Sequence, residues 1–478
     1  MTLIENFIFK QLSFTGWTNN ADIASVNSNT PLNQKLANNS ILGYNNIYGI
    51  YVAPGSTIYT LSGDDSISSI VTCDLSKNNI SPWKSLIAVF VSGSQSLLNL
   101  GDGNNLLSGS TIYKSLYVPL AYPILTGVDN QGTILFGTGN DIIEGKASTN
   151  IAGILSSKPV VIYGVYNESI GVIDTGLGDD ILRTTISTAL NGSVGLYNVG
   201  KILLGDGNDK VLCSFSRDPS QPRTGLSVSI VSGIDNKGII DLGNGNNEVN
   251  VSIDSTWIGV VPSLSNQASG IITSGNGSDS ITATQIGNAG LISLGAGLDT
   301  ITATQISNAG LISLGDGIDT VTGSYVGQSG SVLDFGNDND YSKANINLAA
   351  GSKVLMGSGD DSVTGGFTTA DATSTLAAGV IDLGDGNDKL IATIASKGTS
   401  FGGAGLDSYL TQSGGYQVKV YTDYFDVTAL LSTGLPSTNI VHLYGFESFG
   451  SSVTGGATIT PADGKYLFGT DGSITKVA

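Results

Sequence analysis

The chain has 478 residues and a formal net charge of −19, with 20 Lys and Arg residues against 39 Asp and Glu residues. This balance argues against a nucleic-acid partner, because there is no basic stripe to contact phosphates. No apolar run approaches the roughly 18 residues that a membrane span requires. The single histidine and two distant cysteines argue against a zinc site, and we expect Cys73 and Cys213 to be buried free thiols.

The composition predicts stacked strands joined by tight turns. Glycine contributes 66 residues, charged residues only 12% and hydrophobic residues 40%, while apolar side chains alternate with Ser and Thr. Only five of the 39 acidic residues are Glu. Asp is preferred where a short carboxylate serves a turn or a cation, so divalent cations are the expected partners.

The N-terminal segment, 1–58, differs in composition from residues 59–408. It is rich in Asn, Tyr and Phe and is interpreted as a cap, because the end coil of a repeat array would otherwise expose unpaired strand edges. Its first ten residues lack the charged and apolar regions of a signal peptide. We therefore expect a protein that is cytosolic, or one exported by a route that reads no N-terminal signal.

Residues 59–408 contain an internal repeat. Residues 281–300 and 301–320 differ at three positions only. Their shared ending, Gly-x-Gly-x-Asp, recurs in thirteen turns between 59 and 408, of which one is partial, one is distorted and two end in Asn. The final acidic position recurs about every 20 residues in the C-terminal half of this region. It recurs at longer steps in the N-terminal half, where proline-bearing loops are inserted.

One repeat predicts one coil of a parallel β-solenoid. Leu-Ile-Ser-Leu and Ile-Thr-Ala-Thr-Gln-Ile both alternate with period two, which is typical of half-buried strands. Gly-x-Gly-x-Asp forms the turn at one end and Asn-Ala-Gly the turn at the other. The sequence therefore predicts an all-β parallel solenoid with inward ladders of Ile, Leu and Val, right-handed by the general rule for parallel crossovers.

The C-terminal segment, 409–478, lacks the repeated turn and is rich in Tyr and Phe. We interpret it as a C-terminal cap; a secretion signal and a docking surface for neighbouring molecules remain alternatives.

The repeated turn also has a chemical interpretation. Gly-x-Gly-x-Asp bends carbonyl oxygens toward one point and adds a carboxylate, which are the oxygen ligands that calcium prefers. Stacked turns would place two layers of such oxygens on either side of a gap. The alternative is an Asp/Asn ladder without a cation, in which the side chains satisfy the N–H groups of the turns.

Gly-x-Gly-x-Asp-x-(Ile/Val/Leu) resembles the RTX, or hemolysin-type, calcium-binding repeat over roughly 59–408. The resemblance implies a right-handed parallel β-roll with calcium between its coils. The motif occurs here once per coil, so calcium is expected along one edge only. The first glycine of the RTX pattern is mostly Leu, Phe, Met, Ser or Thr, which adds an inward or flanking side chain. Asn105 and Asn247 replace the final Asp, and their gaps should bind more weakly.

The resemblance implies eleven metal ligands and four supplementary carboxylates. The ligands would be Asp65, Asp141, Asp180, Asp209, Asp279, Asp299, Asp319, Asp340, Asp361, Asp388 and Asp407. The supplementary carboxylates, which lie between the two glycines of their turns, would be Asp102, Asp206, Asp316 and Asp385.

The resemblance also implies a location and a function. Many RTX proteins leave the cell by type I secretion with an uncleaved C-terminal signal, so we expect an extracellular or cell-surface protein. Surface-layer and filament proteins of bacteria, including cyanobacteria, use similar repeats. The expected function is therefore a structural protein that assembles with copies of itself, with cell-surface polysaccharide as a further partner.

Three other functions are considered. A polysaccharide lyase or epimerase would need an acid and a base on one face, and no such cluster occurs outside the turns. Gly398-Thr-Ser400-Phe-Gly402 fits the nucleophile-elbow pattern but lies between two strands, so no catalytic residue is predicted.

An adhesin could use Trp83, Trp257, Arg217 and Arg223. Ice binding could use Thr282, Thr284, Thr302 and Thr304, although other coils break this pattern.

Overall fold

The computed structural model describes residues 23–28, 45–52, 54–60, 62–75, 83–115, 124–151, 161–188, 193–216, 231–253, 262–369, 379–393, 396–453 and 456–477. These residues form an all-β parallel solenoid without a helix, which confirms the predicted fold class. None of them belongs to a helix that could cross a membrane. The chain divides into two compact units, Met1–Thr273 and Ser274–Ala478, which are described separately. Most of the predicted N-terminal cap, 1–58, lies outside the described residues.

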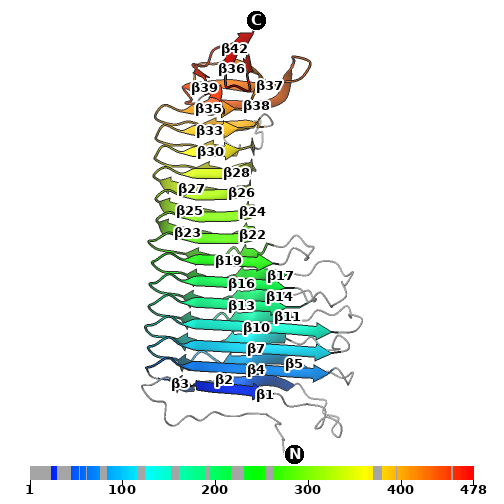
Figure 1. Cartoon of the computed structure of the whole chain (residues 1–478), viewed down its shortest axis with the longest axis vertical. Helices are drawn as coiled ribbons and strands as arrows, with labels where there is room; N and C mark the ends of the chain where they lie inside the picture. The colour runs from blue at the N-terminus through cyan, green and yellow to red at the C-terminus, as the bar shows by residue number, and fades with distance from the viewer. Residues whose placement is uncertain are drawn as a thin grey trace, which may run out of the picture. The chain divides into compact units, whose positions relative to one another are not determined.

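In the first unit the described strands form three columns, and strands within a column pair in parallel (Figure 1). The first column begins with β1 (Ile23–Ser28) and continues with the strands that follow the Asp turns: β4 (Ser66–Leu75), β7 (Leu106–Ser115), β10 (Ile142–Ile151), β13 (Ile181–Ser187), β16 (Lys210–Ser216) and β19 (Glu248–Ile253). The second column contains β2 (Asn45–Val52), β5 (Trp83–Val91), β8 (Ile124–Asn130), β11 (Val161–Asn167), β14 (Ser193–Asn198), β17 (Val231–Asn236) and β20 (Leu264–Asn266). The third contains short strands that lead into the Asp turns: β3 (Thr57–Tyr59), β6 (Leu97–Asn99), β9 (Thr133–Leu135), β12 (Val172–Asp174), β15 (Lys201–Leu203), β18 (Ile239–Asp241) and β21 (Ile271–Thr273).

A coil of the first unit is therefore longer than the two-strand coil of the 20-residue repeat, as the longer steps in this half of the sequence predict. After β7 the chain passes through 116–123 and returns as β8, which runs into the second turn and then into β9. The predicted loop residues Arg217, Arg223 and Trp257 lie outside the described residues, and the side chain of Trp83 is not described.

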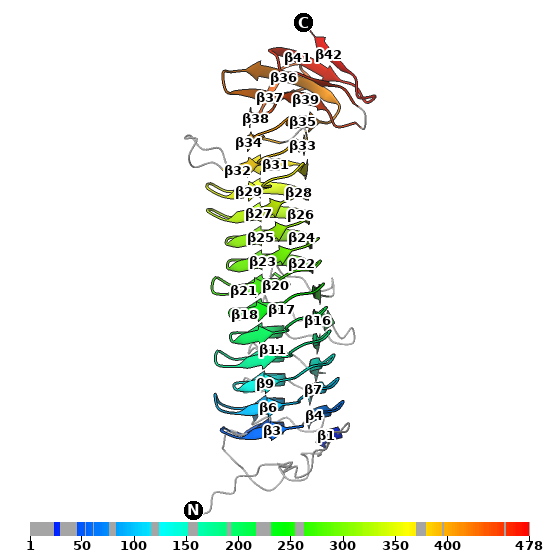
Figure 2. The ribbon, with the colours of Figure 1, turned by 90° about the vertical axis from the view of Figure 1, so that its left-hand side faces the viewer.

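In the second unit the first four coils have two strands and two turns, as the 20-residue repeat predicts (Figure 2). One column contains β22 (Ser280–Asn288), β24 (Thr300–Asn308), β26 (Thr320–Gly327), β28 (Tyr341–Leu348), β30 (Ser362–Gly365), β31 (Phe367–Thr369), β33 (Lys389–Ala392), β35 (Ser408–Thr411) and β39 (Ser448–Ser451). The other contains β23 (Leu291–Ala296), β25 (Leu311–Asp316), β27 (Val332–Asn337), β29 (Lys353–Leu355), β32 (Val380–Asp382), β34 (Gly398–Phe401) and β38 (Pro436–Tyr444).

The C-terminal part of the second unit changes to antiparallel pairing. Its remaining strands are β36 (Gly414–Val420), β37 (Tyr424–Leu430), β40 (Thr458–Ile459), β41 (Gly464–Phe468) and β42 (Ile474–Val477). Strands β37 and β38 form an antiparallel hairpin, and β38 also pairs in parallel with β34 of the last coils. Phe449 and Tyr466 are buried here. This part covers the terminal coil strands β34 and β35 with strands of its own.

The core consists of apolar columns stacked in register, and each coil contributes several buried residues to them. In the first unit the column Leu107, Ile143, Leu182, Val211 and Val249 is buried throughout. The residue before the first turn glycine also points inward, because Leu100, Leu204, Leu294 and Met356 are fully or almost fully buried. This position adds a second apolar column beside the Asp turns.

A candidate metal centre along the aspartate ladder

Within each unit the final positions of the turns form a buried row, here called the aspartate ladder of that unit. In the first unit the N–H of Asp65 donates to Oδ1 of Asn105 at 2.9 Å, and the N–H of Asn105 donates to Oδ1 of Asp141 at 2.7 Å. The series continues through Asp180, Asp209 and Asn247 at 2.7–2.8 Å. Each side chain is therefore fixed by the backbone of the coil before it.

The second unit has the same ladder without an asparagine. Its seven rungs are Asp279, Asp299, Asp319, Asp340, Asp361, Asp388 and Asp407, joined by N–H to Oδ1 bonds of 2.7–2.9 Å. The N–H of Asp407 donates to Oε2 of Glu447 at 2.7 Å, so Glu447 ends the row. Sequence reasoning missed Glu447. The signal was its position before Ser448 and Phe449, which match Ser408 and Tyr409 after Asp407.

All eleven predicted ligand carboxylates lie in these rows, and each is at most 2% exposed. The turns allow this burial because their glycines stack without side chains. Gly205 has a φ of 90°, and a Cβ on it would lie 1.6 Å from the carbonyl oxygen of Gly176 in the preceding coil. Only glycine permits so close an approach of the two backbones.

The second carboxylate oxygen of most rungs has no hydrogen-bond partner. Oδ2 is buried and unpartnered at Asp141, Asp180, Asp209, Asp299, Asp319, Asp340, Asp361, Asp388 and Asp407. A buried ionised carboxylate is costly unless a donor or a cation compensates it. A hydrogen-bond donor or a cation would compensate these oxygens, and the described side chains supply neither.

Burial perturbs the ionisation of these carboxylates in a consistent direction. It raises the pKa of Asp299 and Asp319 to about 7 and the pKa of Asp340 to about 8, and neighbouring rungs add a smaller repulsion. The pKa of Asp361 rises to about 6 for the same first reason. The cause is the loss of water around the charged form.

The four supplementary carboxylates lie in a separate, exposed column of the turns. Oδ1 of Asp102 accepts hydrogen bonds from the N–H and hydroxyl of Thr138, at 2.9 and 3.1 Å. Asp206 and Asp316 accept from the side-chain amides of Asn244 and Asn337 in the next coils. Asp385 is likewise exposed. The side chains of Asp102, Asp206 and Asp316 thus join coils at the surface, outside the buried row.

The ladder offers calcium the right kind of atom. Its candidate donors are all oxygens, carboxylate and main-chain carbonyl, which suit a hard cation. Among the described residues no three His, Cys, Asp or Glu side chains form a metal-binding group. Because calcium takes six to eight oxygens, an ion at a rung would take most of them from turn carbonyls.

A second buried ladder runs along the turns opposite the Asp turns and was missed from the sequence, where its asparagines were interpreted only as turn formers. In the first unit Nδ2 of each asparagine donates to Oδ1 of the next at 2.8–2.9 Å. The residues are Asn130, Asn167, Asn198, Asn236 and Asn266. The signal was the recurrence of Gly-(Val/Ile/Leu)-x-Asn, as in Gly127–Asn130 and Gly195–Asn198.

The residues considered for catalysis and for ice binding lie within ordinary strands of the solenoid. Ser400 is buried in β34 and donates to the carbonyl of Ile381 at 3.1 Å, so its hydroxyl is not presented at a turn. Thr282 and Thr302 are exposed neighbours in register. The pairing between β24 and β26 shifts after Thr302, which breaks the threonine pattern.

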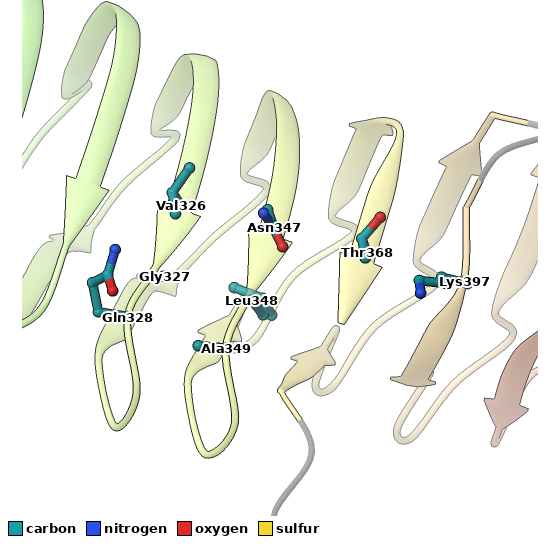
Figure 3. Close-up of a pocket in the computed structure, with 8 residues that line it drawn as sticks. All are labelled: Val326, Gly327, Gln328, Asn347, Leu348, Ala349, Thr368 and Lys397. Carbon is teal, nitrogen blue, oxygen red and sulfur yellow. The ribbon is translucent and has the colours of Figure 1, made fainter. Parts of the chain in front are cut away.

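A hollow of about 200 Å³ lies on the second unit (Figure 3). Val326, Asn347, Thr368 and Lys397 follow one another there on successive coils. Its lining contains no carboxylate, histidine or cysteine. The hollow therefore offers no acid–base pair for polysaccharide cleavage.

Comparisons of the chain with protein-family models, with curated proteins and with solved structures found no match.

Proposed function

We propose that this chain is a calcium-stabilised structural protein of the RTX-like kind, which works outside the cell and assembles with copies of itself into a layer or filament. The observation that carries the proposal is the run of buried carboxylates with unpartnered oxygens along one edge of the coils. Divalent cations between the coils would neutralise such a run at neutral pH.

Electrostatics supports a cation at the ladder. Strands in a sheet lie about 4.8 Å apart, and two like charges at that spacing repel by several kcal/mol at the effective dielectric constant of a protein. Among the described residues no Lys or Arg forms an ion pair with a ladder carboxylate, because the ion pairs there involve Glu144, Glu248 and Asp426. Divalent ions between the coils would turn repulsion into attraction.

When bound, calcium would supply positive charge and a flexible oxygen-preferring coordination sphere. The ladder residues would hold it through Oδ2, and the turn glycines would add main-chain carbonyls. Calcium is plentiful outside cells and scarce in the cytosol, so binding would couple folding to export.

The calcium part of the proposal is tested by titration of the chelator-treated protein. Bound calcium is counted by elemental analysis after gel filtration, and circular dichroism follows the strand signal. We expect several ions per chain and a midpoint of unfolding that rises with calcium concentration. Unchanged stability and no retained calcium would contradict it, and magnesium serves as the control cation.

The assembly part of the proposal rests on the large share of the described chain that forms repeated coils. Apart from the antiparallel C-terminal part, the described residues of both units are repeated coils, and repetition of this kind produces long regular surfaces. We expect fibres or sheets in electron micrographs of the concentrated protein in calcium. Monodisperse monomers at every concentration, measured by light scattering, would refute self-assembly while leaving calcium binding intact.

A further inference from the structure

The two asparagine rungs show what the second side-chain atom of a rung faces. Nδ2 of Asn105 donates to the carbonyl oxygens of Gly101 and Gly103, each at 3.0 Å. Nδ2 of Asn247 lies 3.3 and 3.2 Å from the carbonyl oxygens of Gly243 and Gly245. Because Oδ1 of each asparagine accepts an N–H from the preceding coil, the orientation of both amides is fixed.

The aspartate rungs occupy the same positions in the same ladder. Oδ1 of Asp361, for example, accepts the N–H of Asp340 at 2.7 Å, as Oδ1 of Asn105 accepts the N–H of Asp65. Oδ2 of Asp361 then takes the place of the asparagine Nδ2 and is unpartnered. An acceptor thus stands where an asparagine rung places a donor to its turn carbonyls.

We propose that Asn105 and Asn247 are cation-independent rungs, in which the side-chain amide does the work that a bound cation does at the aspartate rungs. The identity of the cation as calcium rests on the proposed function; the exchange of amide for cation rests on the contacts above. Weaker cation binding at these two positions would therefore carry no loss of stability, because the side-chain amide itself donates to the turn carbonyls.

The two units consequently differ in how much they depend on the cation. The first unit has two self-sufficient rungs among six, and its longest run of aspartates is Asp141, Asp180 and Asp209. The second unit has seven aspartates in succession, from Asp279 to Asp407. Removal of the cation should open the second unit first.

Hydrogen exchange on the full chain tests this order. Peptides from β22–β35 should lose protection at a lower chelator concentration than peptides from β4–β19, and calcium should restore them. Simultaneous loss of protection, or earlier loss in the first unit, would overturn the order. A chain that binds no calcium and exchanges identically with and without chelator would refute the proposed function as well.

The variants Asp361→Asn and Asp360→Asn form a matched pair in a single turn. Both remove one negative charge, but Asp361 is a buried rung, whereas Asp360 is exposed and accepts from Asn387. In chelator, Asp361→Asn should raise the unfolding midpoint by a few degrees above the wild type, and Asp360→Asn should leave it almost unchanged. In calcium, only Asp361→Asn should retain fewer ions.

The reciprocal change, Asn105→Asp, should lower the midpoint in chelator and recover it in calcium. A lower midpoint for Asp361→Asn in chelator would overturn the inference, because the amide would then fail to complete the rung. If the wild type binds no calcium but Asp361→Asn still stabilises the protein, the donor requirement stands and calcium as its natural supplier is refuted.

Discussion

The backbone N–H of Asp319 donates to Oδ1 of Asp340 at 2.7 Å, which leaves the other oxygen of this carboxylate buried and without a partner. The same relationship joins successive aspartate rungs in both units. A single hydrogen bond thus fixes the position of each carboxylate but does not compensate its negative charge. The stability of the coils therefore depends on the proton or cation that neutralises this charge.

The first consequence concerns pH. Burial raises the pKa of Asp319 to about 7 and of Asp340 to about 8, whereas an unfolded Asp titrates near about 4. Between these values the folded chain binds more protons than the unfolded chain, so stability falls as pH rises. Chelator-treated protein should therefore require more urea to unfold at pH 5 than at pH 8. Saturating calcium should reduce the difference, and greater stability at pH 8 in chelator would contradict the expectation.

The inward apolar columns give a second prediction. Ile301 is fully buried and stacks between Ile281 and Val321 of the neighbouring coils, whereas the adjacent Thr302 points to solvent. Ile301→Ala should lower the free energy of unfolding by about 2–5 kcal/mol. Thr302→Ala, on the opposite face of the same strand, should change it by less than about 0.5 kcal/mol. Equal effects in denaturant titrations would mean that this column is not a packed core.

The repeat predicted the coil and the position of the ladder because its period is visible in the residues themselves. Glycine spacing locates the turns, and alternation of Ile and Thr around 281–286 assigns the inward face. The pattern could not show that Oδ1 of Asp361 accepts the N–H of Asp340. That bond depends on the distance between coils, which no single turn encodes.

The additional strand of the first unit was harder to predict. Strands such as β8 (Ile124–Asn130) and β11 (Val161–Asn167) follow insertions of different length, so their spacing in sequence is irregular. Their pairing is nevertheless in register, with Asn130 opposite Asn167. Tertiary stacking sets this register, and sequence spacing across variable insertions hides it.

The asparagine ladder supplies a third prediction. Nδ2 of Asn198 donates to Oδ1 of Asn236 and to the carbonyl of Ile239, at 2.8 and 2.9 Å, in a fully buried position. Asn198→Ala would leave buried acceptors unpaired and should cost at least about 2 kcal/mol.

Asn208→Ala is the control for this prediction. Asn208 also bonds across coils, through Nδ2 to Oδ1 of Asp179 at 3.0 Å, but it is exposed and water can replace it. The two variants are compared by thermal unfolding in calcium. A larger loss for Asn208→Ala than for Asn198→Ala would show that the buried ladder contributes little.

Cys213 provides the fourth prediction and a reporter for the first unit. It is a free, buried thiol on β16, as the sequence predicted, and burial raises its pKa to about 12. Thiolate is the reactive form, so in a Cys73→Ser background the thiol should resist a disulfide reagent in calcium and react rapidly in urea. In moderate chelator the thiol should stay protected while the second unit exchanges its amides, because Asn105 and Asn247 complete rungs of the first unit without a cation. Rapid labelling under these conditions would show that the first unit opens together with the second.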